Sequence, residues 1–280
     1  PNKKKSLEYK NINWDEGIVV LAITIDKTNK NLSDYCTKPD LDSPTQAYKL
    51  CVKGDALRLA NLHQDAISKY LNSILIDREN ADSYYGLGIC YKYVNNIEKA
   101  ISTLEKAKKL RDMDANIFYE LGICHMISGN IEVAMKNLIK SLKLDPENLN
   151  AQIQLAIAHE IVEEQDIALM IYQKIIETSP SYLKAYNHKS ALLISMGNYH
   201  EASILFNKVL KLNPDYYRAY LGIGICFDKL NKTSEATRYY KKFLTCKPNS
   251  NHAPFVKERL SKIALSKTVN KENKFLSLIR

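Results

Sequence analysis

The sequence predicts an all-α protein in which helical hairpins of 34 residues are stacked side by side. The first observation is that alanine and proline recur every 34 residues, at Ala66, Ala100, Ala134, Ala168, Ala202 and Ala236, and at Pro146, Pro180, Pro214 and Pro248. The second is that residues 115–148 hold two runs with apolar residues three and four positions apart, which is the helical period. Gly129-Asn130 separates the two runs and Pro146 closes the second. One such hairpin cannot bury its own apolar face, so neighbouring hairpins must cover it.

Two more slots of the repeat keep their character. A small residue recurs at Gly54, Gly88, Gly122, Ala156, Ser190 and Gly224, and a bulky one at Tyr70, Leu104, Leu138, Tyr172, Phe206 and Tyr240. With the alanines and prolines, this pattern resembles the tetratricopeptide repeat family over residues 47–250. The resemblance implies a right-handed superhelical solenoid whose first helices line a concave groove that binds a protein partner.

The period sets the expected organisation within residues 45–250. Six repeats follow one another at 47–80, 81–114, 115–148, 149–182, 183–216 and 217–250. In the fourth repeat, Glu163-Glu164-Gln165 stands where Gly129 and Gly197 mark the turn elsewhere, so we expect a longer or less tight turn there. Residues 251–266 should form a capping helix, because apolar and basic residues fall on opposite faces. Residues 267–280 form a basic tail.

Residues 1–44 do not fit the repeat and are interpreted as a non-repeat segment with a linker. Within them, Gly17–Ile25 is an apolar run typical of a strand or an extended docked segment, and it is shorter than the ~20 residues of a membrane span. Two interpretations remain open. The segment is a loosely ordered lead or the end of another domain, or Ile18–Ile25 folds back and covers an apolar surface of the solenoid.

The sequence gives no sign of catalytic, cofactor or metal chemistry. Cys90, Cys124 and Cys226 share one slot, and equivalent positions on packed helices lie about 8–10 Å apart, beyond the ~7 Å limit for a disulfide. We therefore expect small core residues in a reducing compartment, and hence a cytoplasmic protein. His125 and His159 occupy a core aromatic slot. Because no phosphate loop or nucleophile motif is present, we expect no enzyme, no cofactor and no small-molecule substrate.

Charge and position predict the partner site. The net charge is +9, from 40 basic and 31 acidic residues, but residues 45–250 carry 26 basic against 22 acidic. By the family resemblance, the groove would be lined by Tyr85, Ile89, Tyr93, Asn116, Tyr119, Ile123, Ile127, Asn150, Ile153, Ile157, Lys184, Asn187 and Arg218. This groove would be apolar in its middle and basic toward its C-terminal end. A protein or peptide with an apolar stretch and an acidic end would fit it.

Other functions stay open beside this one. The family's clamp for the acidic C-termini of chaperones needs Lys and Asn at positions where this chain has Cys51 and Asp55, so that binding mode is not expected. The repeats could instead recruit substrates for an enzyme whose catalytic part lies upstream. Nucleic-acid binding would use the basic tail and the lysines of the second helices (Lys106, Lys108, Lys109, Lys241, Lys242). The sequence does not predict an oligomeric state.

Overall fold

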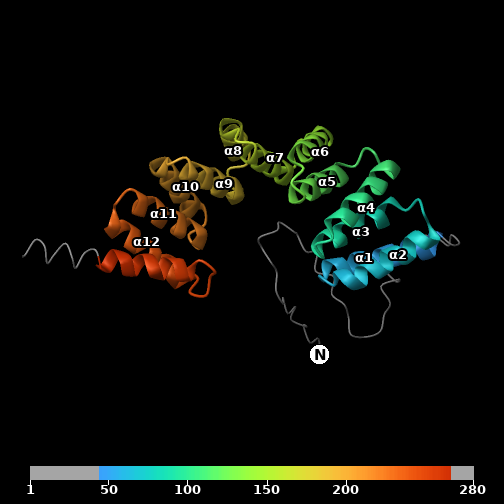
Figure 1. Ribbon diagram of the computed structural model, residues 1–280, viewed down its shortest axis with the longest axis horizontal. Coiled ribbons are helices and arrows are strands. Elements are labelled where there is room, and N and C mark those ends of the chain that lie inside the picture. The colour runs from blue at the N-terminus through green and yellow to red at the C-terminus, as the bar shows by residue number, and fades with distance from the viewer. Residues whose placement is uncertain (1–43, 266–280) are drawn as a thin grey trace, which may run out of the picture. The chain divides into compact units, whose positions relative to one another are not determined.

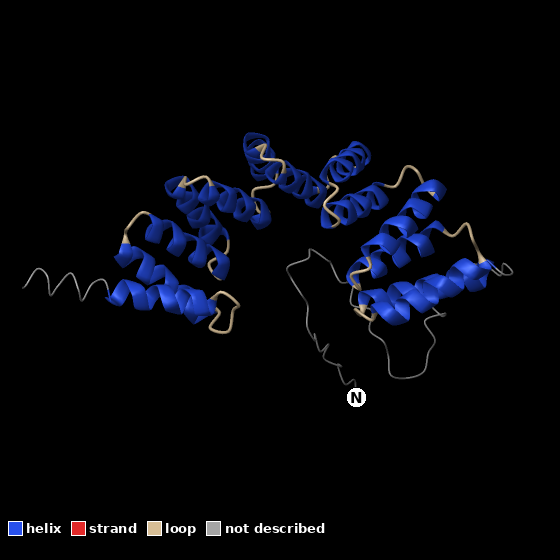
Figure 2. Cartoon of the chain, in the orientation of Figure 1, coloured by secondary structure: helices blue, strands red, loops and turns tan. Residues whose placement is uncertain are grey.

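The computed structural model describes residues 44–265, and every regular element in that range is a helix (Figures 1 and 2). The all-α helical-repeat fold class is therefore confirmed. The helices are α1 (Pro44–Leu59), α2 (His63–Ile76), α3 (Ala81–Tyr93), α4 (Ile97–Leu110), α5 (Ala115–Ile127), α6 (Ile131–Leu144), α7 (Leu149–Ile161), α8 (Gln165–Thr178), α9 (Leu183–Ser195), α10 (Tyr199–Leu212), α11 (Tyr217–Lys229) and α12 (Thr233–Cys246). A terminal helix follows over residues 253–265. The interpretations of Gly17–Ile25 and of residues 267–280 fall outside the described residues.

The chain divides into two compact units at the turn between α5 and α6. Unit 1 ends at Asn130 and unit 2 begins at Ile131. In the described residues, unit 1 therefore holds α1–α5, and unit 2 holds α6–α12 with the terminal helix. The division falls inside the third 34-residue repeat, so the two helices of that repeat belong to different units.

Each hairpin turn contains one residue in the left-handed backbone conformation. These residues are Asn61, Asn95, Gly129, Glu163, Gly197 and Asn231, again 34 positions apart, with φ between 58° and 82°. The expectation of a looser turn in the fourth repeat is wrong. The amide of Glu164 donates to the carbonyl of His159 at 2.9 Å, as the amide of Asn130 donates to that of His125. Glu163 thus adopts the backbone that glycine adopts in the neighbouring turns.

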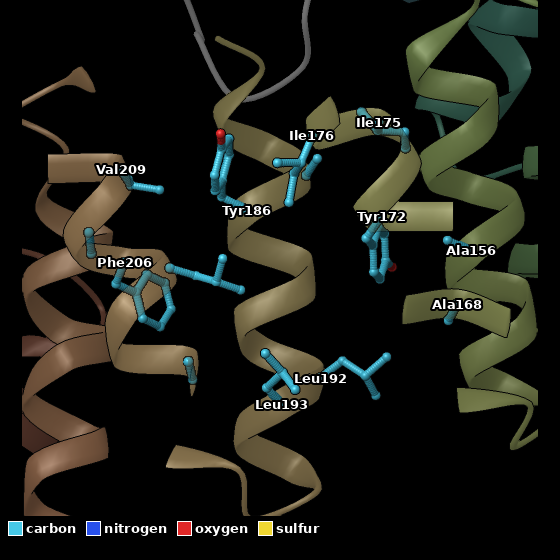
Figure 3. Packing of buried hydrophobic residues seen from close by; sticks show 14 of the residues in the cluster. Ala156, Ala168, Tyr172, Ile175, Ile176, Tyr186, Leu192, Leu193, Phe206 and Val209 are labelled. Atoms are coloured by element: carbon cyan, nitrogen blue, oxygen red, sulfur yellow. The ribbon is translucent and has the colours of Figure 1, made fainter. Parts of the chain in front are cut away.

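The small and bulky slots pack against each other across each hairpin. A β-carbon on Gly54 would lie 2.7 Å from the Tyr70 ring, and one on Gly224 would lie 2.6 Å from the Tyr240 ring. At these two positions only a residue without a side chain leaves room for a ring this close. The same slot holds Ala156 and Ser190 in two repeats of unit 2, where Figure 3 shows Tyr172, Leu193 and Phe206 in the spaces between neighbouring helices.

A second glycine slot, which the 34-residue pattern of alanine and proline does not reveal, joins one repeat to the next. A β-carbon on Gly222 of α11 would lie 2.3 Å from Phe206 of the preceding repeat. Gly86 of α3 stands in the same relation to Tyr70. These glycines let the first helix of a repeat approach the aromatic ring of the repeat before it.

The terminal helix covers the last repeat, as a capping helix should. Its Val256 and Ile263 are buried together with Tyr240 and Phe243 of α12. Arg259 donates two hydrogen bonds to the Asp228 carboxylate of α11, at 2.7 and 2.8 Å. The Tyr240 hydroxyl also donates to that carboxylate, at 3.1 Å. Apolar burial and a bidentate ion pair therefore hold the helix on unit 2.

Candidate partner-binding surfaces

First helices of neighbouring repeats contact each other in both units. Within unit 1, α1 contacts α3 and α3 contacts α5, and within unit 2, α9 contacts α11, whereas α7 makes no comparable contact with α9. No two second helices make a comparable contact in the part of the chain that the structure describes. The first-helix layer is thus the more closely spaced side of each unit, which we call its inner face. All thirteen predicted site residues lie on first helices, namely α3, α5, α7, α9 and α11.

On the inner face of unit 1, the predicted residues differ in accessibility. Tyr93, Asn116 and Ile127 are exposed. Half-buried are Tyr85, Tyr119 and Ile123. Ile89 is only 5% exposed and belongs to the core, so its assignment to an accessible surface is corrected. Aromatic and aliphatic side chains nevertheless remain at the surface of both α3 and α5.

A buried ion pair also lies on this face. The Lys92 ammonium is 2.7 Å from a Glu120 carboxylate oxygen, which joins α3 to α5, and both side chains are mostly buried. The ammonium also lies 4.9 Å from the centroid of the Tyr93 ring. Burial disfavours the charged form of Lys92, yet the charge and hydrogen bond of Glu120 raise its pKa above the ordinary value. The inner face of unit 1 therefore combines apolar side chains with one charge pair whose charges neutralise each other. The Lys92–Glu120 pair is not among the features predicted from the sequence.

On the inner face of unit 2, polar residues predominate. The Asn150 side-chain oxygen accepts a hydrogen bond from the Tyr182 hydroxyl at 2.8 Å. Ile153 is 3% exposed and packs in the core, so it too is removed from the accessible surface. Half-buried residues here are Ile157, Lys184 and Asn187, whereas Arg218 is exposed.

His188 lies among the basic residues of this face and was missed by the sequence analysis. Its ring stacks on Tyr172 with the ring centroids 5.9 Å apart. Burial lowers the pKa of His188, and the positive charges of Lys184 and Arg218 lower it further. His188 is therefore neutral at pH 7 and leaves the positive charge of this region to Lys184 and Arg218. His188 occupies the same slot of the repeat as Gly86 and Gly222. Glycine in two repeats of this slot is the sequence signal that its residue lies against a neighbouring helix.

The slot shared by three cysteines is buried, as predicted. Burial raises the pKa of Cys90 to about 11, and that of Cys124 and Cys226 to about 12, so these thiols are protonated at neutral pH.

The ring nitrogen Nδ1 of His159 lies 2.6 Å from a carboxylate oxygen of Glu164, which is hydrogen-bond distance. Among the described residues, no group of three histidine, cysteine or acidic side chains is arranged to hold a metal ion. No described helix is long and apolar enough to cross a membrane.

Comparison with protein families matches residues 37–270 to the coatomer epsilon subunit family. The chain belongs to this family. A comparison of the sequence with curated proteins found no match. The family assignment covers all six helical hairpins and the terminal helix.

Solved structures show that the fold of this family member is that of tetratricopeptide repeats, which confirms the resemblance. YrrB, described as a tetratricopeptide protein with an unusual peptide-binding site, is 21% identical with a TM-score of 0.51, covering 68% of this chain and 97% of that one. PilF of Pseudomonas aeruginosa is 14% identical with a TM-score of 0.64, covering 78% and 99%. In the Cut9–Hcn1 hetero-tetramer of APC/C, the matching chain is 18% identical with a TM-score of 0.63, covering 79% and 43%.

Proposed function

We propose that this chain is a non-catalytic protein-interaction module or assembly scaffold that binds a partner segment on its inner faces. The observation that carries the proposal is the set of large side chains at the surface of unit 1, above all Tyr93 and Ile127. Tyr93 also stacks on His63 of α2 with the ring centroids 4.6 Å apart, so part of its ring packs within the fold. Ile127 is more than half exposed and belongs to no core cluster of unit 1, so the fold does not require it to be large and apolar. Membership in a family named for a subunit also supports work within an assembly.

The chemistry of the two faces describes the partner. Unit 1 offers aromatic and β-branched side chains around the neutralised Lys92–Glu120 pair. Unit 2 offers Lys184 and Arg218 beside a neutral histidine. An apolar stretch of a protein or peptide partner would match unit 1, and an acidic end would match unit 2. Helical-repeat proteins use extended surfaces of this kind for binding, without cofactor or catalysis. We place this function in the cytoplasm.

Paired variants test the proposal one unit at a time. The unit 1 variant is Tyr119→Ala with Ile127→Asp, and the unit 2 variant is Lys184→Glu with Arg218→Glu. The matched control is Lys109→Glu with Lys211→Glu, which changes exposed charges on the second helices α4 and α10. Capture of native-lysate proteins by full-length wild type and variants is quantified by mass spectrometry.

Loss of two central contacts should weaken capture of a specific partner by about tenfold or more, because a few buried side chains dominate binding energy. The unit 2 variant should release partners with acidic segments preferentially, and the control should behave as wild type. The proposal is wrong if both inner-face variants keep the wild-type set of captured proteins while circular dichroism shows them folded. Recruitment for an enzyme encoded upstream stays a prediction, which the full reading frame would test.

Nucleic-acid binding gains no support from the second-helix lysines. Lys108 forms an ion pair with Glu105, and the Lys106 ammonium lies 5.8 Å from the centroid of the Tyr84 ring. Lys242 lies over Tyr220 in the same way. These lysines therefore have local partners, so we do not propose a nucleic-acid function.

A further inference from the structure

Exposed apolar side chains recur on the second helices of three consecutive repeats in unit 2. They are Val133 on α6, Ile167 and Met170 on α8, and Ile204 on α10, each between 41% and 70% exposed. We call these four residues the outer stripe. Val133 and Ile167 directly precede the buried alanines Ala134 and Ala168. Met170 and Ile204 follow Ala168 and Ala202 by two positions, on the opposite side of the helix, and none of the four residues belongs to the buried core.

Comparison between repeats shows that the outer stripe is not required by the fold. Val133 and Ile167 occupy a slot that holds Asp65, Lys99 and Glu235 in other repeats. Met170 and Ile204 occupy a slot that holds polar residues elsewhere, namely Ser68, Ser102, Lys136 and Arg238. Solvent-facing slots have thus become apolar on the second helices of consecutive repeats, which is typical of a surface that another segment covers.

The surroundings of the outer stripe are acidic. The first two turns of these three helices and the hairpin turns before them hold one lysine, Lys136, and five exposed carboxylates, namely Glu132, Glu163, Glu164, Asp166 and Glu201. The other lysines of the three helices lie in later turns, and Glu164 and Glu201 also contact His159 and Lys189. A segment that covers the stripe should therefore be both apolar and basic.

We propose that the outer stripe is the docking site of this chain's own C-terminal segment, residues 267–280. This segment has the required composition, with four basic residues and one acidic residue over fourteen positions. Its second half is apolar at Phe275, Leu276, Leu278 and Ile279. Apolar side chains would cover the stripe while the basic residues pair with the carboxylates around it.

The point at which the described chain ends supports this assignment. Asp228 is next to the last residue of α11, and therefore marks the edge of unit 2 where the hairpin turns lie. Arg259 binds Asp228, and Leu265 stands six residues, or about 9 Å of helix, farther along the terminal helix. The outer-stripe residues lie in the first two turns of their helices, directly after hairpin turns at this same edge. The remaining residues can span roughly 50 Å when extended, which is enough to pass α12 and α11 at the 8–10 Å spacing of packed helices and to reach α10.

Methionine oxidation provides a test with an internal reference in the full-length chain. Met170 in the outer stripe and Met113 in unit 1 are 70% and 67% exposed in the described structure, so without a covering segment peroxide should oxidise them at similar rates. A segment docked for about 90% of the time would slow oxidation of Met170 about tenfold. Peptide mapping of the wild type should therefore show Met170 reacting about ten times more slowly than Met113, and high salt should reduce the difference.

Two variants should remove this protection and one should not. Phe275→Asp with Leu276→Asp changes only the segment, and Ile167→Asp changes only the stripe, so both should bring the two rates within about twofold of each other. Ser102→Asp is the control, because Ser102 occupies in unit 1 the slot that Met170 occupies in unit 2. It should leave the protection of Met170 unchanged.

Three results would overturn the proposal. Equal oxidation of Met170 and Met113 in the wild type would show that nothing covers the stripe. Protection that survives the Phe275→Asp, Leu276→Asp change would assign the cover to another segment or partner. Protection that rises with protein concentration would assign it to a second copy of the chain. None of these results bears on the inner faces, so the proposed function is tested separately.

Discussion

Glu163 and Gly197 occupy the same place in consecutive hairpin turns of unit 2 and allow a reciprocal test of the turn. Their φ angles are 64° and 82°, both left-handed. This conformation costs a residue with a β-carbon about 1–2 kcal/mol, whereas glycine avoids that cost but loses about 0.5–1 kcal/mol more conformational entropy on folding. The net difference is about 0.5–1 kcal/mol in favour of glycine. Glu163→Gly should therefore stabilise unit 2, and Gly197→Glu should destabilise it by a similar amount.

The structure isolates the backbone contribution at both positions. A β-carbon on Gly197 would have no atom within 4 Å, so packing does not change. The Glu163 side chain is exposed and has no hydrogen bond or ion pair in the described structure, so little is lost with it. Glu163→Ala keeps the β-carbon, and it serves as the control that should not reproduce the gain of Glu163→Gly.

Urea unfolding of the full-length variants, followed by circular dichroism, would measure the difference. Opposite shifts of the unfolding midpoint, with unchanged dependence on urea, are expected. A loss of stability in Glu163→Gly would refute the reasoning, as would a neutral effect of Gly197→Glu. In either case the left-handed residue would not limit the stability of the turn.

Three further changes test the packing and charge of unit 2. Gly222→Ala should destabilise by about 1–3 kcal/mol in urea unfolding, because the new β-carbon would lie 2.3 Å from the buried Phe206 ring. Arg259→Met should cost about 1–3 kcal/mol and speed amide exchange in the terminal helix, because the mostly buried Asp228 loses two hydrogen bonds. His188→Phe should reduce the loss of thermal stability between pH 7 and pH 5. In the wild type, the pKa of His188 is lower in the folded chain than in the unfolded chain. As pH falls below about 6.5, the unfolded chain therefore binds the proton first and the folded state loses stability.

The fold could be predicted from the sequence because the period of a repeat is a property of the sequence itself. The alanine slot and the bulky slot are buried in every hairpin, as their spacing requires. The prediction for the turn of the fourth repeat is wrong because glycine is not the only residue that marks this turn. Asparagine at Asn61, Asn95 and Asn231 already showed that the slot needs a left-handed backbone rather than glycine. Glutamate adopts it because the surrounding turn hydrogen bonds fix the backbone.

The candidate site was less predictable, because accessibility depends on neighbours that the period does not describe. Ile89 and Ile123 occupy the same slot, yet Ile89 is buried and Ile123 is half-exposed. The Lys92–Glu120 pair could not be found from spacing either, since its residues occupy different slots of consecutive repeats. A slot identifies the face of a helix, whereas the neighbouring repeats decide how much of each side chain remains at the surface.

Departures from the repeat carry different meanings at buried and at exposed slots. Lys53 of α1 and Lys189 of α9 occupy a slot where Leu87, Leu121 and Ile223 are buried. Lys53 is exposed, whereas the Lys189 ammonium donates to the Gln173 side-chain oxygen at 2.8 Å, so a charge in this slot meets either solvent or a polar partner. Met170 is the reverse case, because an apolar side chain replaces serine or a charged residue in a slot that the fold leaves exposed. Solvent or a polar partner satisfies the lysines, but only a covering segment would give the methionine apolar contacts.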